Sequence, residues 1–398
     1  LMVEGSMANL AVTDADSVDD SATLTVTGNT TIDTSAGNGT VSLDDTSNSL
    51  AGTVMISSGS GAITVDNNTT ALDLVTNSSG TVTVTDAGAL TVAGSMGSFV
   101  VTDADSVDDS ATLTVTGATT IDTSAGNGSI MLDDDANSLG GTVTVTSGSG
   151  GITLDNATNA LDVVSTSSGA VTIENSGALT AAGSMGSLMV SNATSVNDSA
   201  TLTITGTTDI DTSASNGAVT LDDDANSLGG TVMVNAGTGN LTVDNGTTDL
   251  SLAVTSATDV TVENAAAVSL GSSAIAGNLV INSDGNISQT AAISVSGTTT
   301  IDADSDDDAD NSVTLTDASN DFMSTVSIDD GSSVSVSDAN DLEIGTTNAS
   351  TSLALVAGGA ISDSGNIITP TLSFDAGDTV TLNTLDIATL ADSQSGGN

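Results

Sequence analysis

The amino-acid sequence predicts an all-β protein that folds as a parallel β-helix (β-solenoid), and three observations support this prediction. Short apolar–polar–apolar triplets recur about once every ten residues, which is the period-two pattern of a strand with one buried face. Gly, Asn, Asp and Ser separate the triplets, and these residues favour turns. The triplets are grouped into a sequence repeat of 89 residues, and no segment has helical periodicity beyond a single turn.

Nine short strands are expected in each repeat. Each strand is one triplet, and polar segments such as SSGSG and NSSG form the corners between strands. In chain order, the expected strands of the first complete repeat centre on Leu24–Val26, Ile32, Val41–Leu43, Val54–Ile56, Ile63–Val65, Leu72–Leu74, Val82–Val84, Leu90–Val92 and Phe99.

The repeats are visible as near-identical copies of one segment. The sequence VTDADSVDDSATLTVTG at Val12–Gly28 recurs unchanged at Val101–Gly117 and, with substitutions, at Val190–Gly206. A fourth, diverged copy has Gly297 at the position of Gly206. Repetition at this length is typical of solenoids and of tandem arrays.

The expected domain division follows from these copies. Because Leu1 aligns with Leu90, the chain is expected to begin inside a repeat and to be a piece of a longer array. The expected parts form one continuous solenoid: the tail of a preceding repeat (1–11), repeat 1 (12–100), repeat 2 (101–189), repeat 3 (190–280), and a divergent repeat 4 with C-terminal coils (281–398).

Tandem immunoglobulin-like β-sandwiches are the alternative architecture, because they also repeat at about 90 residues. Sandwich strands have about five residues or more and usually pack against a large aromatic residue. This chain has three Phe and no Trp or Tyr, and its inward positions are Val, Leu, Ile and Ala, which favours the solenoid. Three coils of about 30 residues or four of about 22 would each divide the repeat, and both divisions stay open.

The charge of the chain excludes several classes of function. The sequence has no Lys, Arg, His or Cys and 51 acidic residues. Without cationic side chains it has no means to clamp phosphates or to neutralise a nucleic-acid backbone. Without His and Cys it lacks the usual general base and the thiol nucleophile. We therefore expect no nucleic-acid partner, and the absence of an apolar run of about 18 residues predicts no membrane insertion.

Clusters of aspartate predict binding sites for a hard divalent cation, with calcium as the candidate, because Ca²⁺ prefers carboxylate and carbonyl oxygens. The richest cluster lies in repeat 4, and alternating aspartates on a turn also occur in repeats 1 and 2. Repeat 3 replaces three of the four aspartates with Asn192, Thr194 and Asn197. The candidate metal ligands are Asp302, Asp304, Asp306, Asp307, Asp308, Asp310, Asp14, Asp16, Asp19, Asp20, Asp103, Asp105, Asp108 and Asp109.

A second acidic motif raises the possibility of catalysis. The runs Asp44–Asp45, Asp133–Asp135 and Asp222–Asp224 follow the same strand in three repeats, and paired carboxylates hydrolyse glycosidic bonds in β-helix enzymes. Such enzymes need cations or aromatic residues to hold a sugar, and recurrence in every repeat indicates architecture. We expect no catalytic residues and no enzyme activity, with a β-helix carbohydrate-active enzyme as the minor alternative.

The C-terminal part of the chain resembles the β-strand repeats of filamentous-haemagglutinin-type secreted exoproteins. The resemblance is closest in NSVTLTDASNDFMSTVSIDDGSSVSVSDANDLEIGTTNASTSLALVAGGAISDSG (Asn311–Gly365), and Asn137–Val164 is a diluted form of the same phrase. It implies a right-handed parallel β-helix, secretion with a partner transporter, and a role in adhesion, aggregation or biofilm matrix. The chain departs from that family in its lack of basic residues and its regular 89-residue period.

These observations together predict a structural extracellular fibre or a surface or matrix protein, stabilised by divalent cations and located outside the cell or at its surface. Its expected partners are copies of itself, joined end to end or laterally, with glycans or a cell surface as further candidates. The alternative is the stalk of a two-partner-secreted adhesin, in which a less repetitive tip domain would recognise the target.

Overall fold

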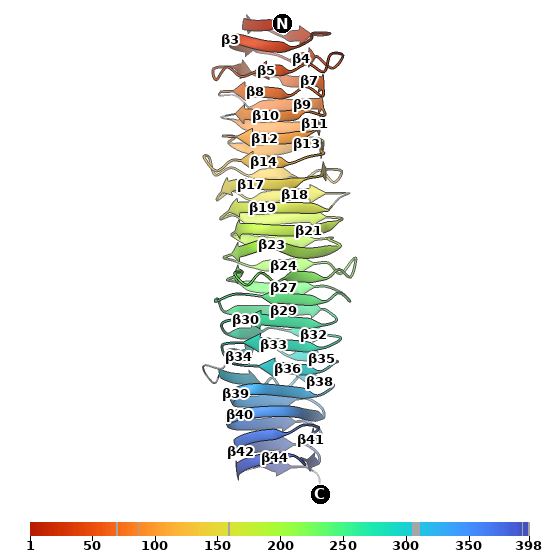
Figure 1. Cartoon of the computed structure of the whole chain (residues 1–398), viewed down its shortest axis with the longest axis vertical. Helices are drawn as coiled ribbons and strands as arrows, with labels where there is room; N and C mark the ends of the chain where they lie inside the picture. The colour runs from red at the N-terminus through yellow and green to blue at the C-terminus, as the bar shows by residue number, and fades with distance from the viewer. Residues whose placement is uncertain (69–70, 87, 158–159, 305–310, 392, 397–398) are drawn as a thin grey trace. The chain divides into compact units, whose positions relative to one another are not determined.

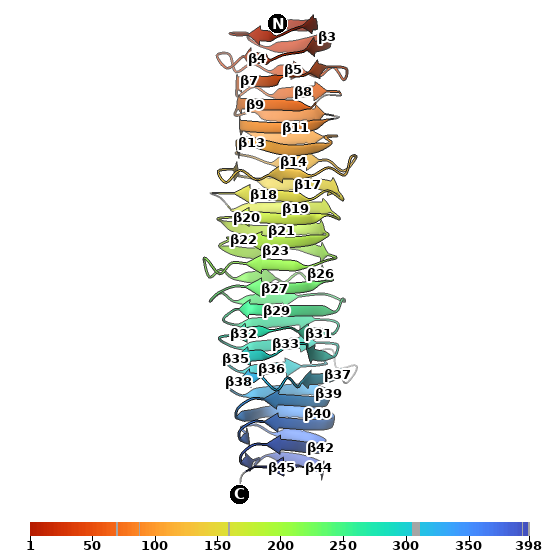
Figure 2. The same ribbon diagram turned by 180° about the vertical axis from the view of Figure 1, so that it is seen from behind.

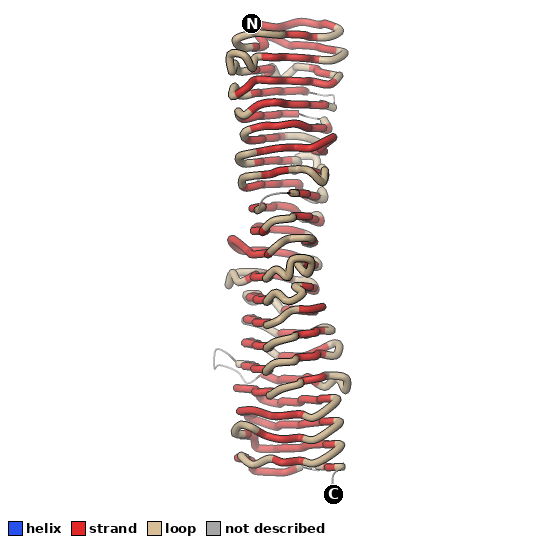
Figure 3. Tube along the Cα trace, turned by 90° about the vertical axis from the view of Figure 1, so that its right-hand side faces the viewer, coloured by secondary structure: helices blue, strands red, loops and turns tan. Residues whose placement is uncertain are grey.

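The protein is an all-β parallel β-solenoid of about 20 turns. The computed structural model describes residues 1–68, 71–86, 88–157, 160–304, 311–391 and 393–396. These residues form strands, turns and loops, with no helix among them (Figure 3). The chain divides into two compact units, Leu1–Ala193 (unit 1) and Thr194–Asn398 (unit 2). The predicted all-β solenoid is therefore confirmed.

Unit 1 contains the strands β1 to β22. Their bounds are β1 Met2–Met7, β2 Leu10–Val12, β3 Val18–Val26, β4 Thr30–Asp33, β5 Val41–Leu43, β6 Ser49–Leu50, β7 Thr53–Gly59, β8 Ile63–Asn67, β9 Leu72–Ser78, β10 Thr81–Asp86, β11 Ala89–Met96, β12 Ser98–Thr102, β13 Ser106–Val115, β14 Thr119–Asp122, β15 Ile130–Leu132, β16 Ser138–Leu139, β17 Thr142–Gly148, β18 Ile152–Asn156, β19 Leu161–Ser167, β20 Ala170–Asn175, β21 Ala178–Met185 and β22 Ser187–Ser191.

The strands of unit 1 alternate between two stacks of parallel strands, and the coils of the unit lie one below the other (Figure 1). Stack A consists of β1, β3, β5 with β6, β8, β10, β12, β14, β17, β19 and β21. Stack B consists of β2, β4, β7, β9, β11, β13, β15 with β16, β18, β20 and β22. Each coil therefore contributes one segment to each stack.

Equivalent strands of repeat 1 and repeat 2 lie in different stacks. Strand β3 lies in stack A, whereas β13, which carries the same sequence in repeat 2, lies in stack B. The reason is that each repeat supplies nine segments, an odd number, to two alternating stacks. One repeat is therefore four and a half coils, and partners in neighbouring coils are 17 to 24 residues apart, as in Val82 with Phe99 and Thr119 with Val143. Neither three nor four coils per repeat is right.

The core of unit 1 is built from the inward residues of the triplets. Val54 and Ile56 of β7 are fully buried, and the Met55 side chain between them is 48% exposed. In stack A, Phe99 lies between Val82 and Thr119 in the register of neighbouring strands. The first and third residues of each triplet are buried in a stack of aliphatic side chains. This burial of apolar surface is the main contribution to stability, because the chain has few aromatic residues and no ion pairs between side chains.

Unit 2 contains the strands β23 to β45 (Figure 2). Their bounds are β23 Ser195–Ile204, β24 Thr208–Asp211, β25 Val219–Leu221, β26 Ser227–Leu228, β27 Thr231–Asn235, β28 Leu241–Asp244, β29 Leu250–Ser256, β30 Val260–Asn264, β31 Val268–Leu270, β32 Ser273–Ile275, β33 Leu279–Ser283, β34 Ile287–Gln289, β35 Ile293–Val295, β36 Thr299–Asp302, β37 Asn311–Leu315, β38 Asp321–Phe322, β39 Val326–Asp338, β40 Leu342–Ala357, β41 Ile361–Asp363, β42 Ile367–Ala376, β43 Val380–Thr381, β44 Leu385–Leu390 and β45 Gln394–Ser395.

Part of unit 2 has three strands in each coil. A separate three-stranded sheet of β32, β35 and β38 runs beside the stacks that contain β30, β33 and β36, and β31, β34 and β37. The pairings between described strands are parallel throughout both units, so the alternative of tandem β-sandwiches, which are antiparallel, is wrong. The described part of the chain has no helix long and apolar enough to span a membrane.

Candidate metal centre

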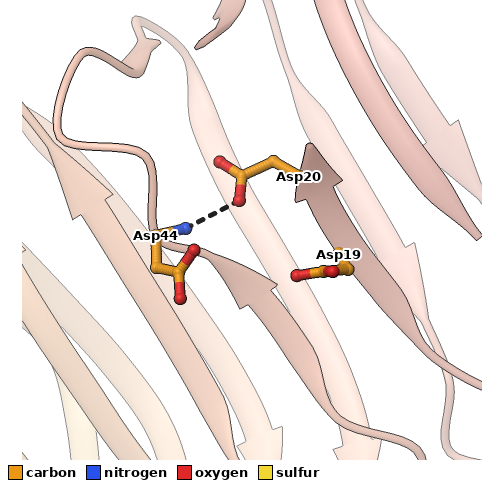
Figure 4. Close-up of side chains that lie close together, drawn as sticks. All are labelled: Asp19, Asp20 and Asp44. Atoms are coloured by element: carbon orange, nitrogen blue, oxygen red, sulfur yellow. Dashed lines mark hydrogen bonds between the residues drawn. The ribbon is translucent and has the colours of Figure 1, made fainter. Parts of the chain in front are cut away.

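Three carboxylates from neighbouring coils meet in repeat 1. Asp19 and Asp20 are adjacent on β3, and Asp44 directly follows β5, whose Ser42 pairs with Asp19. One oxygen of each carboxylate lies within 4.8 Å of the others. Figure 4 shows the three side chains and the elements from which they come. Asp19 and Asp44 are exposed, whereas Asp20 is only 8% exposed. The alternation of the strand causes this difference, because adjacent residues point to opposite faces.

The Asp20 carboxylate is hydrogen-bonded by the polypeptide. Its Oδ1 accepts the backbone N–H of Asp44 at 3.0 Å. Its Oδ2 accepts the backbone N–H of Asp45 at 3.1 Å and the Nδ2 amide of Asn48 at 2.6 Å. Hydrogen bonds to an ionised acceptor are stronger than neutral ones. Asp20 therefore ties β3 to a loop of the next coil, residues 44–48, which we name the capped loop.

The same arrangement recurs in repeats 2 and 3, where Asp109 and Asp198 take the place of Asp20. The capped loops of these repeats are residues 133–137 and 222–226. The donors to Asp109 are the backbone of Asp133 and Asp134 and the amide of Asn137, and the donors to Asp198 are the backbone of Asp222 and Asp223 and the amide of Asn226. Of the four aspartates considered for repeat 3, only Asp198 is retained in the sequence, and it is the one that holds the capped loop.

The acidic runs considered as catalytic pairs are parts of the capped loop. Asp45 Oδ1 accepts the N–H of Ser47 at 2.9 Å and the hydroxyl of Thr23 at 3.3 Å. The backbone carbonyl of Asp45 accepts the N–H of Asn48 at 2.9 Å. Asp134 and Asp223 accept the equivalent side-chain and backbone donors in repeats 2 and 3. These bonds close a turn, which gives the recurrence of the run a structural cause.

Repeat 2 contains the second group of three carboxylates, Asp108, Asp109 and Asp133, again within 4.8 Å of one another. Desolvation raises the pKa of Asp108, and the nearby negative charges of Asp133 and Asp109 raise it further. A divalent cation would relieve this repulsion, since it replaces like-charge contacts with attraction. Both groups therefore have the chemistry of a site for a hard metal ion.

Repeat 3 has one carboxylate fewer at this place. Asn197 occupies the position of Asp19 and Asp108, and its Nδ2 donates to the backbone carbonyl of Asp198 at 2.7 Å. The capped loop is thus complete in all three repeats, but a cluster of three carboxylates forms in repeats 1 and 2 only, among the residues that the structure describes. The loop and the candidate ion site are separate features of the same segment.

The other predicted ligands of repeats 1 and 2 do not join these groups. Asp14 and Asp103 are exposed at a corner where both have a φ of 62°, a left-handed conformation that Asp tolerates better than most residues. Asp16 and Asp105 are exposed as well. In the described parts of the chain, none of these four belongs to a group of three closely spaced carboxylates.

The cluster of repeat 4 is described only in part. Asp302 ends β36, and its Oδ1 accepts the backbone N–H of Asp304 at 3.2 Å. Asp304 is 6% exposed. Asp306, Asp307, Asp308 and Asp310 lie outside the described residues, so a metal site at this cluster stays a prediction.

A row of buried asparagines supports the capped loop, and the sequence analysis missed it. Asn48 Oδ1 accepts the N–H of Leu24 at 2.7 Å, and Asn67 Oδ1 accepts the N–H of Leu50 at 2.9 Å. Asn48 and Asn67 are both fully buried. Equivalent bonds are made by Asn137, Asn156, Asn226 and Asn245. The sequence signal for this role is an Asn that occupies the same position in repeats 1 to 3, as Asn48, Asn137 and Asn226 do.

The chain belongs to a family described as repeats of unknown function (DUF5649). The family matches residues 3–57, 79–146, 168–235, 257–329 and 331–390, which is more than half of the chain. Two successive matches begin 89 residues apart, at residues 79 and 168, as the sequence repeat does. Comparison with curated proteins and with solved structures gives no match.

Proposed function

We propose that this protein is a structural element of an extracellular fibre, surface layer or matrix, and that its acidic repeats serve assembly rather than catalysis. The observation that carries the proposal is the use of the recurring aspartates. Asp20, Asp109 and Asp198 each bond to donors 24 to 28 residues away in the next coil. Residues that recur in order to join coils serve the architecture of the chain.

Calcium is the proposed ion. The groups Asp19, Asp20 and Asp44, and Asp108, Asp109 and Asp133, offer only oxygen ligands, and the chain has no His or Cys to favour a softer metal. An ion at each group would lie against two successive coils and would neutralise charge that no side chain of the protein can neutralise. The resemblance to secreted exoproteins supports a location outside the cell, where calcium is abundant.

A measurement on the whole chain tests this proposal. Purified protein is analysed by sedimentation velocity and electron microscopy in calcium and in a chelator, each at high and low sodium chloride. We expect larger assemblies and a higher melting temperature in calcium, and partial reversal on chelation. A chain that stays a monomer with one melting temperature in all four buffers would contradict an assembling, calcium-stabilised function.

The variant Asp19→Asn supplies an internal control, because repeat 3 already carries Asn197 at this position. We expect Asp19→Asn to fold normally and to lower the calcium effect on melting. If Asp19→Asn responds to calcium as the wild type does, the group of repeat 1 does not hold the ion.

A further inference from the structure

A regular array of hydroxyl side chains covers part of stack A in unit 1. It consists of the outward residues of β10, β12, β14 and β17, which we name the threonine face, and these strands lie one below the other (Figure 1). The outward residues of β10 and β17 are mainly threonines, namely Thr81, Thr83, Thr85, Thr142, Thr144 and Thr146. The valines between them are fully buried, so they do not interrupt the face.

The outward side chains form straight columns across the coils. In the central column, Thr83 pairs with Val100, and Val100 pairs with Thr120. Thr120 pairs in turn with Thr144. These pairings contain no register shift, so neighbours in a column are about 4.8 Å apart and outward neighbours on a strand are about 6.6 Å apart. The threonine face is therefore a two-dimensional lattice of hydroxyl and methyl groups.

The threonine face carries little charge, although the chain has a formal charge of −51. Asp122 is the one acidic residue among the outward residues of these four strands, and its Oδ1 accepts the N–H and the hydroxyl of Ser124 at 2.9 and 2.6 Å. In the column beside the central one, the hydroxyl oxygens of Thr85 and Thr102 are 3.2 Å apart and share a hydrogen bond. Such a face suits an uncharged partner that donates and accepts hydrogen bonds.

Stack B of the same unit does not offer a comparable surface. Its outward residues include Met131 and Met189, which are 37% and 47% exposed. Asp155 and Glu174 lie side by side in the register of β18 and β20. The pairing of β11 with β13 also contains a register shift, which breaks the regular spacing. The two stacks therefore allow an experiment with an internal control.

The chemistry of the threonine face favours ice over two other occupants. A second copy would bring the same negative charge, and four strands cover roughly 300 Å², whereas a stable interface buries about 800 Å² on each partner. A polysaccharide is usually held by aromatic or cationic side chains, and the chain has no Trp, Tyr, Lys or Arg. Ice requires neither, because it is an uncharged lattice of hydrogen-bond donors and acceptors.

We propose that the threonine face binds ice. The hydroxyls of Thr83, Thr120 and Thr144 hold waters at distances close to the repeat distances of the ice lattice. The threonine methyl groups and Val100 lie between these waters and leave no hydrogen-bonding site for a water outside the lattice. The face adsorbs to an ice surface through these ordered waters and slows its growth. This activity goes beyond the proposed function, because it requires neither calcium nor assembly.

Nanolitre osmometry on the full chain tests the proposal, because a protein that adsorbs to ice depresses the freezing point below the melting point and shapes the crystal. We expect this thermal hysteresis in calcium and in a chelator. A double variant with Thr83→Gln and Thr144→Gln should lose it, because the longer side chains stand out of the plane while the charge is unchanged. The control, with Thr153→Gln and Thr172→Gln, alters two half-buried outward threonines of stack B and should keep it.

Circular dichroism of both double variants checks that the strands are intact, and the wild-type measurement depends on neither variant. A wild type without thermal hysteresis would overturn the proposal, as would equal losses in the two double variants. Retention of the wild type on crystalline cellulose or chitin, with no effect on ice, would also overturn it and would assign the face to a polysaccharide. Hysteresis from a monomer in a chelator would support the face whatever the outcome for assembly.

Discussion

A buried threonine hydroxyl without a partner occurs at the same position in all four repeats. Thr30, Thr119, Thr208 and Thr299 are at most 1% exposed, and the Oγ1 of each lacks a hydrogen-bond partner. Thr119 pairs in register with Phe99 and Val143. An unsatisfied buried hydroxyl costs about 1 to 3 kcal/mol, so the position would suit a valine of the same shape.

We predict that Thr119→Val raises the free energy of unfolding by about 1 kcal/mol, because it removes an unsatisfied polar group and keeps the volume. The matched control is Thr123→Val, since Thr123 Oγ1 donates to the Gly128 carbonyl at 2.7 Å. Thr123→Val should lower the free energy of unfolding by about 1 kcal/mol. Urea denaturation measures both, and shifts of the same sign in the two variants would contradict the assignment.

Asp86 is a buried acid at a position where repeats 2 and 3 have asparagine. It is fully buried, its Oδ1 accepts the N–H of Gly88 at 3.1 Å and the Nδ2 of Asn67 at 3.4 Å, and its Oδ2 has no partner. At the corresponding position, Asn175 donates to two backbone carbonyls. Desolvation is the main cause that raises the pKa of Asp86 to about 6, and the nearby charges of Asp105 and Asp66 contribute.

This pKa makes stability depend on pH in a defined direction. The folded chain holds a proton on Asp86 up to pH of about 6, whereas an unfolded Asp loses it at about 3.9. Unfolding therefore releases a proton between these values, so the free energy of unfolding falls as pH rises from about 4 to about 6. Above that range Asp86 costs the fold about 3 kcal/mol.

We predict that Asp86→Asn stabilises the protein by about 3 kcal/mol at pH 8 and by much less at pH 4. Denaturation at a series of pH values measures the difference between variant and wild type. The reciprocal variant Asn175→Asp should introduce the same pH dependence in repeat 2. A difference between Asp86→Asn and wild type that does not change with pH would show that Asp86 is ionised in the folded chain throughout.

At the scale of the element, the capped loop separates the roles of two adjacent aspartates. Asp109 accepts three hydrogen bonds from the loop of the next coil, while Asp108 is exposed. We predict that Asp109→Ala lowers the free energy of unfolding by about 2 to 3 kcal/mol, because it leaves three donors without their acceptor. In a chelator, Asp108→Ala should change it by less than about 0.5 kcal/mol.

Hydrogen exchange of the backbone amides of Asp133 and Asp134 provides the local measurement. These two N–H groups donate to Asp109, so their protection should be lost in Asp109→Ala and kept in Asp108→Ala. Protection that survives in Asp109→Ala would mean that the loop holds its shape without the carboxylate.

The strands could be predicted from the sequence, and the stacking of the coils could not. Triplets such as Val54–Ile56 and Ile63–Val65 fix which residues are buried, because alternation is a property of each strand alone. The number of coils depends on the lengths of the corners, and these lengths vary. The register partners Thr119 and Val143 are seven residues further apart in sequence than the partners Val82 and Phe99. Composition does not determine how many residues a corner contains, so the division into four and a half coils does not follow from the sequence.

The candidate site was predicted in part for a similar reason. The aspartate-rich segment of β3 is evident in the sequence, but the sequence does not separate the roles of Asp19 and Asp20. The two differ because adjacent strand residues point to opposite faces, so that Asp19 is exposed and Asp20 is buried. The sequence presents Asp44 as part of a possible catalytic pair and not as a metal ligand, because its contact with Asp19 joins residues in different coils. Asn48 carries no charge, so its type alone does not indicate a role at this site, although its amide bonds to both Asp20 and Leu24.

For the whole molecule, the dominant electrostatic fact is a formal charge of −51 with no basic side chain. Every interaction between charged side chains is therefore repulsive, apart from bound ions. We predict that sodium chloride raises the melting temperature steadily from low to molar concentration, because screening weakens repulsion and there are no side-chain ion pairs to lose. Differential scanning calorimetry in a chelator measures this, and a melting temperature that falls with added salt would contradict the prediction.

The exchange of stacks between repeats 1 and 2 determines which changes in copy number the fold of unit 1 can absorb without rearrangement. Deletion of a single repeat would move β13, which shares its sequence with β3, into the stack that β3 occupies, and every later strand of the unit would change sides with it. Deletion or duplication of two repeats restores the original phase. A gain or loss of an even number of copies therefore leaves each surface loop of the unit on its original side, whereas an odd number moves every later loop to the opposite side.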